Sequence, residues 1–352
     1  RKGMARGLLV MAAGVLIFIP AARARSYPVF LARLIVQGTG LSLLQTASNP
    51  YITILGPLES AAKRISIMGI FNKVAGVVSP IILTLLILKG ADGIKNRLTT
   101  ITNIAAKEQL LNELASRVIA PYIMMAIALV ILAVWIRFST LPEVDKAEIS
   151  EEQKDVSIQT KTSILQFPHL IMGAIALFFY VGVEVLAGDT IGQYGRMLGF
   201  NIATYQYFTS YTLICMVIGY IIGIILIPKY LSQKVALQIC TVTALVFSFG
   251  ALFTSGMTTV IFIALLGIAN SLMWPAIWPL ALNRLGSFTK LGSALLVMSI
   301  AGGAIMPMVF GKVADSYPDR PQLAYFMLIP SYLIILFFSV RGYKLGLGQV
   351  DG

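Results

Sequence analysis

The sequence predicts an all-α polytopic membrane protein. Of its 352 residues, 57% are hydrophobic and only 12% are charged, and the mean hydropathy is +0.84. Apolar runs close to the ~20 residues that a helix needs to cross a bilayer recur along the whole chain. A soluble domain of this composition would lack a polar coat, so we expect a lipid bilayer to surround the protein.

Ten apolar runs predict ten membrane-spanning helices. They lie near residues 4–22, 28–55, 65–88, 117–138, 168–194, 203–227, 235–254, 258–282, 291–314 and 322–341. A long charged stretch that is poor in aromatic residues separates the fourth from the fifth, which is typical of a solvated linker. The predicted domains are a transmembrane half at 1–139, a cytoplasmic linker at 140–165 and a second transmembrane half at 166–352.

The net charge of +12 arises from Lys and Arg that gather in short loops. This pattern indicates topology rather than nucleic-acid binding, and it places both ends of the chain in the cytoplasm. Cys215 and Cys240 fall inside predicted spans and His169 stands alone, so we expect no metal, disulfide or cofactor. The absence of a phosphate-binding loop and of a Ser-His-Asp set argues against a primary pump and against an enzyme.

A weak internal repeat relates the two halves. LGPLESAAKRIS (55–66) followed by AGVVSP (75–80) resembles LGSFTKLGS (285–293) followed by GGAIMP (302–307). Transporters are often built from such repeated halves. The first four spans match the last four of the second half. We therefore expect a six-plus-six architecture of which 10 of 12 transmembrane helices are present, the first two lying upstream of Arg1.

Polar side chains within the apolar runs mark a candidate solute site. An unpaired polar group costs roughly several kcal/mol in hydrocarbon, so such residues usually face a bundle interior or a watery cavity. Gln45 and Asn49 lie four residues apart and share one helix face. Their amides both donate and accept hydrogen bonds, which suits a hydroxyl-bearing solute. The alternative is a hydrogen bond between helices.

Four motifs carry a family resemblance. They are LLQTASNPY (43–51), LGPLESAAKRISIMGIFNKVAG (55–76), FFYVGVEVLAGDTIGQY (178–194) and KLGSALLVMSIAGGAIMP (290–307). Through them the chain resembles sugar permeases of the major facilitator superfamily in the fucose:proton symporter branch, and within that branch the glucose/galactose transporters. The resemblance implies the major facilitator superfamily fold, a monomer, and uptake of a monosaccharide of the glucose/galactose type driven by a proton or a sodium ion.

The resemblance also has two departures that bear on coupling. The fucose permease carries a carboxylate where this chain has Gln45, and a neutral amide where this chain has Glu184. It also relies on a carboxylate in its first helix, which this chain does not contain. The protonation site of that permease is therefore not carried over.

Four further residues are predicted to contact the sugar. Asn72 resembles the family's buried amide. Asn270, Trp274 and Trp278 follow one another at i, i+4 and i+8 on one face of the tenth helix. We expect the indole rings to offer a flat platform to the C–H face of a pyranose, and Pro275 and Pro279 to bend the helix. The alternative is packing against neighbouring helices.

Three ionisable residues are predicted to couple transport to the cation. Glu184 lies in an apolar, glycine-bearing stretch and is the predicted proton-responsive group, with a fixed ion pair as the alternative. Lys73 lies about 12 Å into its span and is expected to pair with a carboxylate, either Glu184 or the absent one of the first helix. Asp189 is nearer the outer face, where it is also compatible with a solvated helix end. Arg33 lies close enough to its helix start to snorkel and is interpreted as structural.

The function predicted from the sequence is secondary active uptake of a hexose by alternating access. One alternative is a permease for another polar solute, such as an amino sugar. Another is a sugar sensor that binds without transporting.

Overall fold

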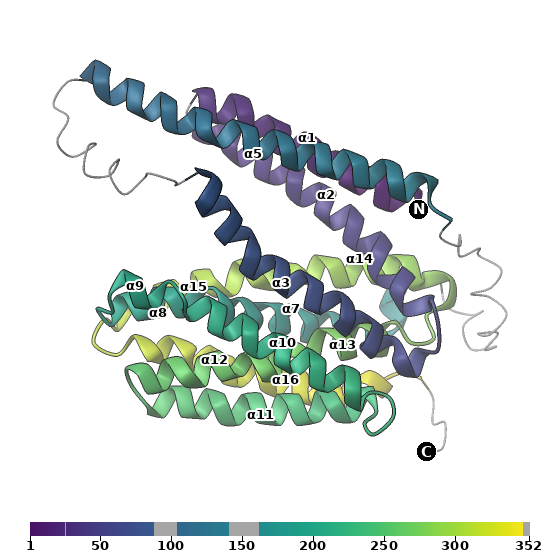
Figure 1. The fold of residues 1–352 in the computed structure, drawn as a ribbon. Helices are drawn as coiled ribbons and strands as arrows, with labels where there is room; N and C mark the ends of the chain where they lie inside the picture. The colour runs from purple at the N-terminus through teal and green to yellow at the C-terminus, as the bar shows by residue number, and fades with distance from the viewer. Residues whose placement is uncertain (25, 88–103, 141–161, 348–352) are drawn as a thin grey trace. The chain divides into compact units, whose positions relative to one another are not determined.

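In the computed structural model, residues 1–24, 26–87, 104–140 and 162–347 are described. Every regular element in these ranges is an α-helix or a 3₁₀ helix (Figure 1). The α-helices are α1 Lys2–Ala24, α2 Tyr27–Ile54, α3 Ala61–Ile87, α5 Ile104–Phe138, α7 Pro168–Gly188, α8 Thr190–Met197, α9 Ile202–Tyr205, α10 Phe208–Leu226, α11 Gln233–Phe253, α12 Met257–Ser271, α13 Met273–Leu282, α14 Thr289–Met298, α15 Gly302–Ser316 and α16 Leu328–Val340. The short 3₁₀ helices are η1 Leu58–Ser60, η3 Ile164–Gln166, η4 Gly286–Phe288, η5 Ser299–Ala301, η6 Pro321–Met327 and η7 Gly342–Lys344.

Nine segments of the described chain are long and apolar enough to cross a membrane. They coincide with nine of the ten predicted spans, which confirms the all-helical fold class. The predicted span at 65–88 corresponds to α3, many of whose later side chains lie outside the described part of the structure. Most of the predicted linker at 140–165 lies outside the described residues as well.

The chain divides into two compact units. One combines Arg1–Ser48 with Val77–Val144, and the other combines Asn49–Gly76 with Asp145–Gly352. The predicted boundaries of the transmembrane halves stay a prediction. Each unit is described by itself below.

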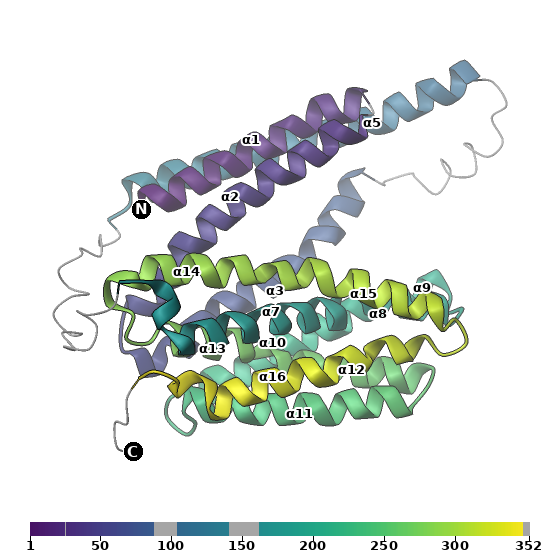
Figure 2. The ribbon, with the colours of Figure 1, turned by 180° about the vertical axis from the view of Figure 1, so that it is seen from behind.

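The first unit is built around α1, α5 and the beginning of α2. Glycines bring the backbones of α1 and α2 together, because a Cβ on Gly40 would lie 2.6 Å from the Met11 nitrogen and one on Gly7 would lie 2.8 Å from the Leu44 nitrogen. Such contacts are typical of helix packing in membranes, where small residues allow close approach. Figure 2 shows α1 and α5 side by side.

Arg33 is buried in the first unit rather than extended toward the membrane surface. Its guanidinium lies 4.7 Å from the ring centroid of Phe18 and 5.1 Å from that of Tyr122, and these two rings stack on each other. It also donates to Gln37 Oε1 at 3.0 Å. The side chain therefore does not extend to the membrane surface, because the aromatic rings of α1 and α5 hold the cation by cation–π contacts, which agrees with the structural interpretation of Arg33.

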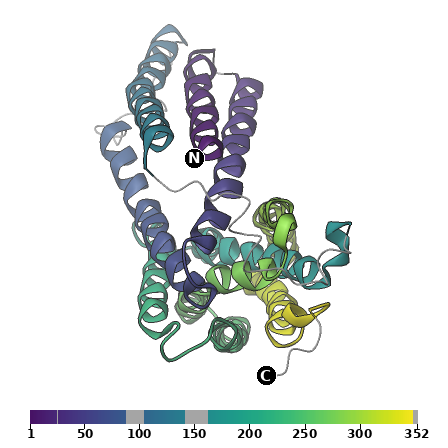
Figure 3. The ribbon, with the colours of Figure 1, turned by 90° about the vertical axis from the view of Figure 1, so that its right-hand side faces the viewer.

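The second unit is a helical bundle around α7. Helices α10, α12, α13, α15 and α16 all contact α7, and they run roughly parallel or antiparallel to one another, as Figure 1 shows and Figure 3 confirms from their ends. Two glycines set the closest approaches: Gly302 faces the carbonyl oxygen of Phe178, and Gly267 faces that of Thr212. Because α7 is surrounded, its side chains must either be apolar or find partners within the bundle.

Candidate functional site

The predicted tenth helix is broken where the site residues begin. It consists of α12 and α13, which meet at Leu272. Pro275 has no N–H to donate to the carbonyl of Ser271, so the α-helical ladder is interrupted there and resumes with a bond of 3.0 Å from Ala276 N–H to the Leu272 carbonyl. The sequence predicted a bend in this helix, and the structure shows a break. Discontinuous helices often mark binding sites in transporters.

Trp274 and Trp278 form an aromatic stack on α13. Their ring centroids lie 5.3 Å apart at an interplanar angle of 22°. Trp274 is only partly buried, whereas Trp278 is fully buried. Tyr180 of α7 packs against Trp274 with a centroid distance of 6.4 Å and an angle of 51°. Trp274 is therefore the more accessible of the two stacked rings.

Asn270 lies at the end of α12, directly before the break. Its side chain is fully buried, and its Oδ1 accepts a hydrogen bond of 2.8 Å from Tyr332 Oη of α16. Its Nδ2 has no hydrogen-bond partner among the described residues. The amide thus keeps two donors uncommitted in the bundle interior.

Lys73 of α3 and Glu184 of α7 form an ion pair. The side chains are 16% and 18% exposed, so the pair is largely removed from solvent. Of the two carboxylates considered as partners of Lys73, the structure shows Glu184. α3 reaches this position because Gly69, one turn before Lys73, leaves room for the ring of Tyr220: a Cβ there would lie 2.6 Å from Tyr220 Cζ.

Three tyrosines lie within electrostatic range of Glu184. Tyr180, Tyr220 and Tyr332 are buried, and each interacts electrostatically with Glu184. Tyr180 lies four residues before Glu184 on α7 and shares its helix face. Asp189, at the junction of α7 and α8, is exposed but interacts electrostatically with both Lys73 and Glu184.

Of the remaining predicted site residues, two belong to the second unit and one to the first. Asn49 is buried near the end of α2 and belongs to the second unit. Asn72 is exposed on α3, since it is turned about 100° from its neighbour Lys73 around the helix axis. Gln45 is partly buried in the first unit. The structure thus brings together Glu184, Lys73 and the Asn270–Trp278 segment in the second unit, and their roles stay predictions.

The three tyrosines were not predicted from the sequence. Tyr180 could have been found, because it precedes Glu184 by one helical turn in FFYVGVEV. Tyr220 and Tyr332 gave no such signal: each is a single aromatic residue within an apolar run, where packing is the ordinary role. Only the fold brings them to the same carboxylate.

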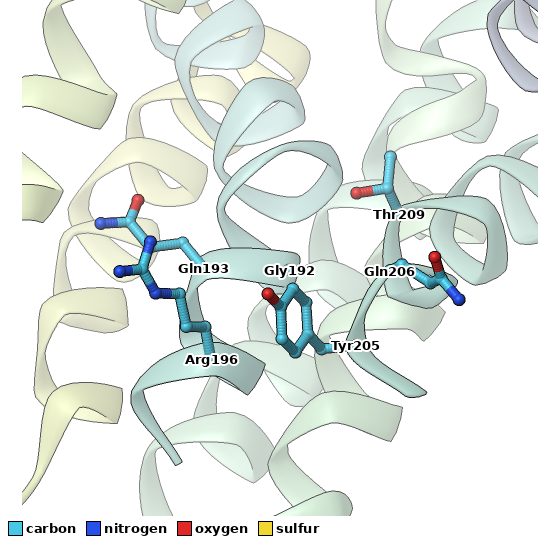
Figure 4. Close-up of a pocket in the computed structure, with 6 residues that line it drawn as sticks. All are labelled: Gly192, Gln193, Arg196, Tyr205, Gln206 and Thr209. Atoms are coloured by element: carbon cyan, nitrogen blue, oxygen red, sulfur yellow. The ribbon is translucent and has the colours of Figure 1, made fainter. Parts of the chain in front are cut away.

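A separate cavity of about 420 Å³ lies past the C-terminal end of α7, beyond Asp189 in the chain. It is lined by Gly192, Gln193, Arg196, Tyr205, Gln206 and Thr209. Figure 4 shows Gln193 and Arg196 on one side of Tyr205, with Gln206 and Thr209 on the other. None of the predicted site residues lines this cavity.

Comparison with known proteins identifies the class. Residues 1–294 match the Major Facilitator Superfamily. The chain is 33% identical to the glucose/galactose transporter of Brucella abortus over 347 residues, which cover 98% of this chain and 79% of that protein. It is 26% identical to the L-fucose-proton symporter of Escherichia coli, with 98% and 78% covered. The chain belongs to the major facilitator superfamily.

Solved structures agree on the fold. A crystal structure of the major facilitator superfamily transporter FucP in the outward conformation matches with a TM-score of 0.79 at 24% identity, covering 96% of this chain and 81% of that one. The proton:xylose symporter XylE bound to 6-bromo-6-deoxy-D-glucose matches with a TM-score of 0.66 at 14% identity, covering 96% and 80%. At these identities the likeness shows the fold alone.

Proposed function

We propose that this protein takes up a hexose of the glucose/galactose type by cation symport through alternating access. The observation that carries the proposal is the Lys73–Glu184 ion pair next to an aromatic platform, in a chain whose relatives are named sugar transporters. The platform suits a pyranose, and the ion pair offers a charge that a cation can change. A transport role, rather than an enzymatic one, follows from the same site.

The ion pair supplies a mechanism for coupling. When the carboxylate of Glu184 takes a proton, it loses its charge and Lys73 loses its partner. Lys73 then has a second carboxylate within electrostatic reach, that of Asp189. A proton arriving at Glu184 would therefore loosen the contact between α3 and α7, and its release would restore the contact. A sodium ion bound at the same carboxylate would act in the same way.

The setting of this mechanism is a multi-pass protein of the cell inner membrane, acting as a monomer with both termini of the chain in the cytoplasm. Helices α3 and α7 belong to different predicted halves, so a contact between them that opens and closes suits two halves that rock around a central site.

Uptake into membrane vesicles tests the proposal. The full-length protein should accumulate labelled glucose or galactose above the external concentration when a proton or sodium gradient is imposed. If it binds hexose but accumulates none under either gradient, it is a sensor and the symport proposal fails. If an amino sugar is accumulated and neither hexose competes with it, the substrate class is wrong.

A further inference from the structure

We propose that Tyr332 is a positioning residue: it fixes the carboxamide of Asn270 so that Nδ2 donates to one hydroxyl of the sugar and thereby sets the preference among hexose epimers. The inference rests on the proposed function and deepens it, because it names the group that reads the sugar. Tyr332 does not itself contact the sugar.

The carboxamide of Asn270 is held at its oxygen end. Tyr332 Oη donates to Asn270 Oδ1 at 2.8 Å, and neither residue has any exposed surface. A carboxamide is nearly symmetric in shape, so packing alone does not decide which end faces which way. In this structure the Tyr332 hydroxyl lies at the oxygen end and donates to it, which places Nδ2 on the opposite side.

The second observation is the unused donor. Asn270 Nδ2 carries two N–H groups and has no partner among the described residues, although it is fully buried. A buried donor without an acceptor destabilises the fold, because its hydrogen bond to water is lost and not replaced. If Asn270 served only to join α12 to α16, an amide with one end unused would be a poor choice, because a smaller hydroxyl would satisfy Tyr332 at lower cost. A ligand that brings an acceptor removes this penalty.

Asn270 lies close to the aromatic platform along the chain and in the fold. Asn270 is followed by the break at Leu272 and then by Trp274, the partly buried ring of the aromatic stack. Tyr180, which packs on Trp274, lies one helical turn before Glu184 on α7, and Tyr332 is within electrostatic range of Glu184. The Tyr332–Asn270 bond therefore lies in the same cluster as the platform and the ion pair, where a sugar stacked on Trp274 presents its hydroxyl groups.

A fixed donor gives a reason for specificity. Glucose and galactose differ only in the orientation of one hydroxyl group, so a platform that binds the C–H face discriminates weakly between them. A site built to hydrogen-bond one hydroxyl rejects analogues that lack it, because its own polar group is then left unpaired. An amide that could rotate would donate to the hydroxyl group in either orientation, so the site would no longer distinguish the two epimers.

The experiment measures uptake kinetics for glucose, galactose and the series of monodeoxy hexoses with the full-length protein. Tyr332→Phe removes only the hydroxyl group. We expect it to raise KM for the preferred hexose about tenfold, to reduce the KM ratio between the two epimers several-fold, and to leave kcat within about twofold. Asn270→Leu, which keeps the shape of the side chain, should raise KM at least as much. Because Tyr332 acts through Asn270, adding Tyr332→Phe to Asn270→Leu should change neither KM nor the epimer ratio further.

Tyr325→Phe is the matched control. Tyr325 is also fully buried near the beginning of the last span, and its Oη lies 3.2 Å from Thr190 Oγ1. Its loss should leave KM and the epimer ratio unchanged. The proposal is overturned if Tyr332→Phe shifts both quantities no more than Tyr325→Phe does, or if the two effects at Asn270 and Tyr332 add.

The wild-type protein provides a test that does not depend on the folding of a variant. Removal of one particular hydroxyl should raise KM at least tenfold, whereas a protein that tolerates the loss of every hydroxyl in turn would refute a fixed donor. Failure of the proposed function looks different, since the wild type would then accumulate no hexose at all.

Discussion

At the scale of single residues, the ion pair between Lys73 and Glu184 joins α3 to α7. Lys73 and Glu184 are 111 residues apart, and each was recognisable only as a charge in an apolar run. In a low-dielectric interior a charge that loses its partner is costly, so the two groups constrain each other strongly. A change in the charge of either residue therefore weakens or strengthens the contact between α3 and α7.

Substitution of Glu184 tests coupling directly. Glu184→Gln keeps the size of the side chain and removes the charge, so the variant resembles a permanently protonated carboxyl. We expect uphill accumulation to fall to background, while exchange of labelled for unlabelled hexose across the membrane continues. Glu59→Gln, at the helix turn that precedes α3, is a matched control that should keep both activities. Uphill accumulation by Glu184→Gln at the wild-type level would remove this residue from the coupling role.

Substitution of Trp274 tests the platform. A flat indole supplies contact area at little entropic cost, so Trp274→Leu should raise KM for hexose about tenfold and Trp274→Phe by a smaller factor. Trp135 is 70% exposed on α5 and offers the control: Trp135→Leu should leave KM unchanged. Hexose-dependent quenching of tryptophan fluorescence should disappear with Trp274→Leu and persist with Trp135→Leu. The reverse pattern would show that the sugar binds elsewhere.

At the scale of elements, sequence reasoning located the helices well and their interruptions less well. Apolar runs of span length report a helix reliably, because the bilayer requires backbone groups to be satisfied within each segment. The break between α12 and α13 falls at Leu272, three residues before the proline that the sequence marked, because a proline disturbs the turn that precedes it. The place where Asn270 is separated from Trp274 was therefore predicted only as a bend.

The glycine contacts between helices give a prediction at this scale. A Cβ on Gly267 would overlap the carbonyl of Thr212 on α10, whereas a Cβ on Gly311 of α15 would meet nothing within 4 Å. Gly267→Ala should therefore lower the melting temperature of the purified protein, since overpacking typically costs about 1–3 kcal/mol. Gly311→Ala should leave the melting temperature unchanged or raise it, because alanine favours the helix. Equal melting temperatures for the two variants would contradict the backbone-to-backbone packing of α10 and α12.

At the scale of the whole molecule, the sequence was sufficient for the fold class and for the family. Composition and span length indicate helices in a membrane, and four long motifs are specific enough to indicate a branch of transporters. The site stays a prediction. Glu184 and Trp274 were singled out because charges and large aromatics are conspicuous in apolar runs, whereas Tyr332 was not, because its hydrogen bond is to Asn270, which is 62 residues away. Long-range pairs of this kind are set by helix packing, which a single sequence does not display.

The orientation of the protein in the membrane is a further prediction at this scale. The distribution of Lys and Arg places the ends of α12–α13 on opposite sides, with the turn before α12 outside and η4 in the cytoplasm. Ser255 and Ser287 are exposed at these two ends. In a protein whose Cys215 and Cys240 have been replaced by serine and alanine, Ser255→Cys should react with a membrane-impermeant maleimide added to intact cells. Ser287→Cys should react only after permeabilisation, and both variants should keep hexose uptake. Labelling of Ser287→Cys alone in intact cells would show that the topology is the reverse of the predicted one. The side of the membrane from which Glu184 receives its proton would then be reversed as well.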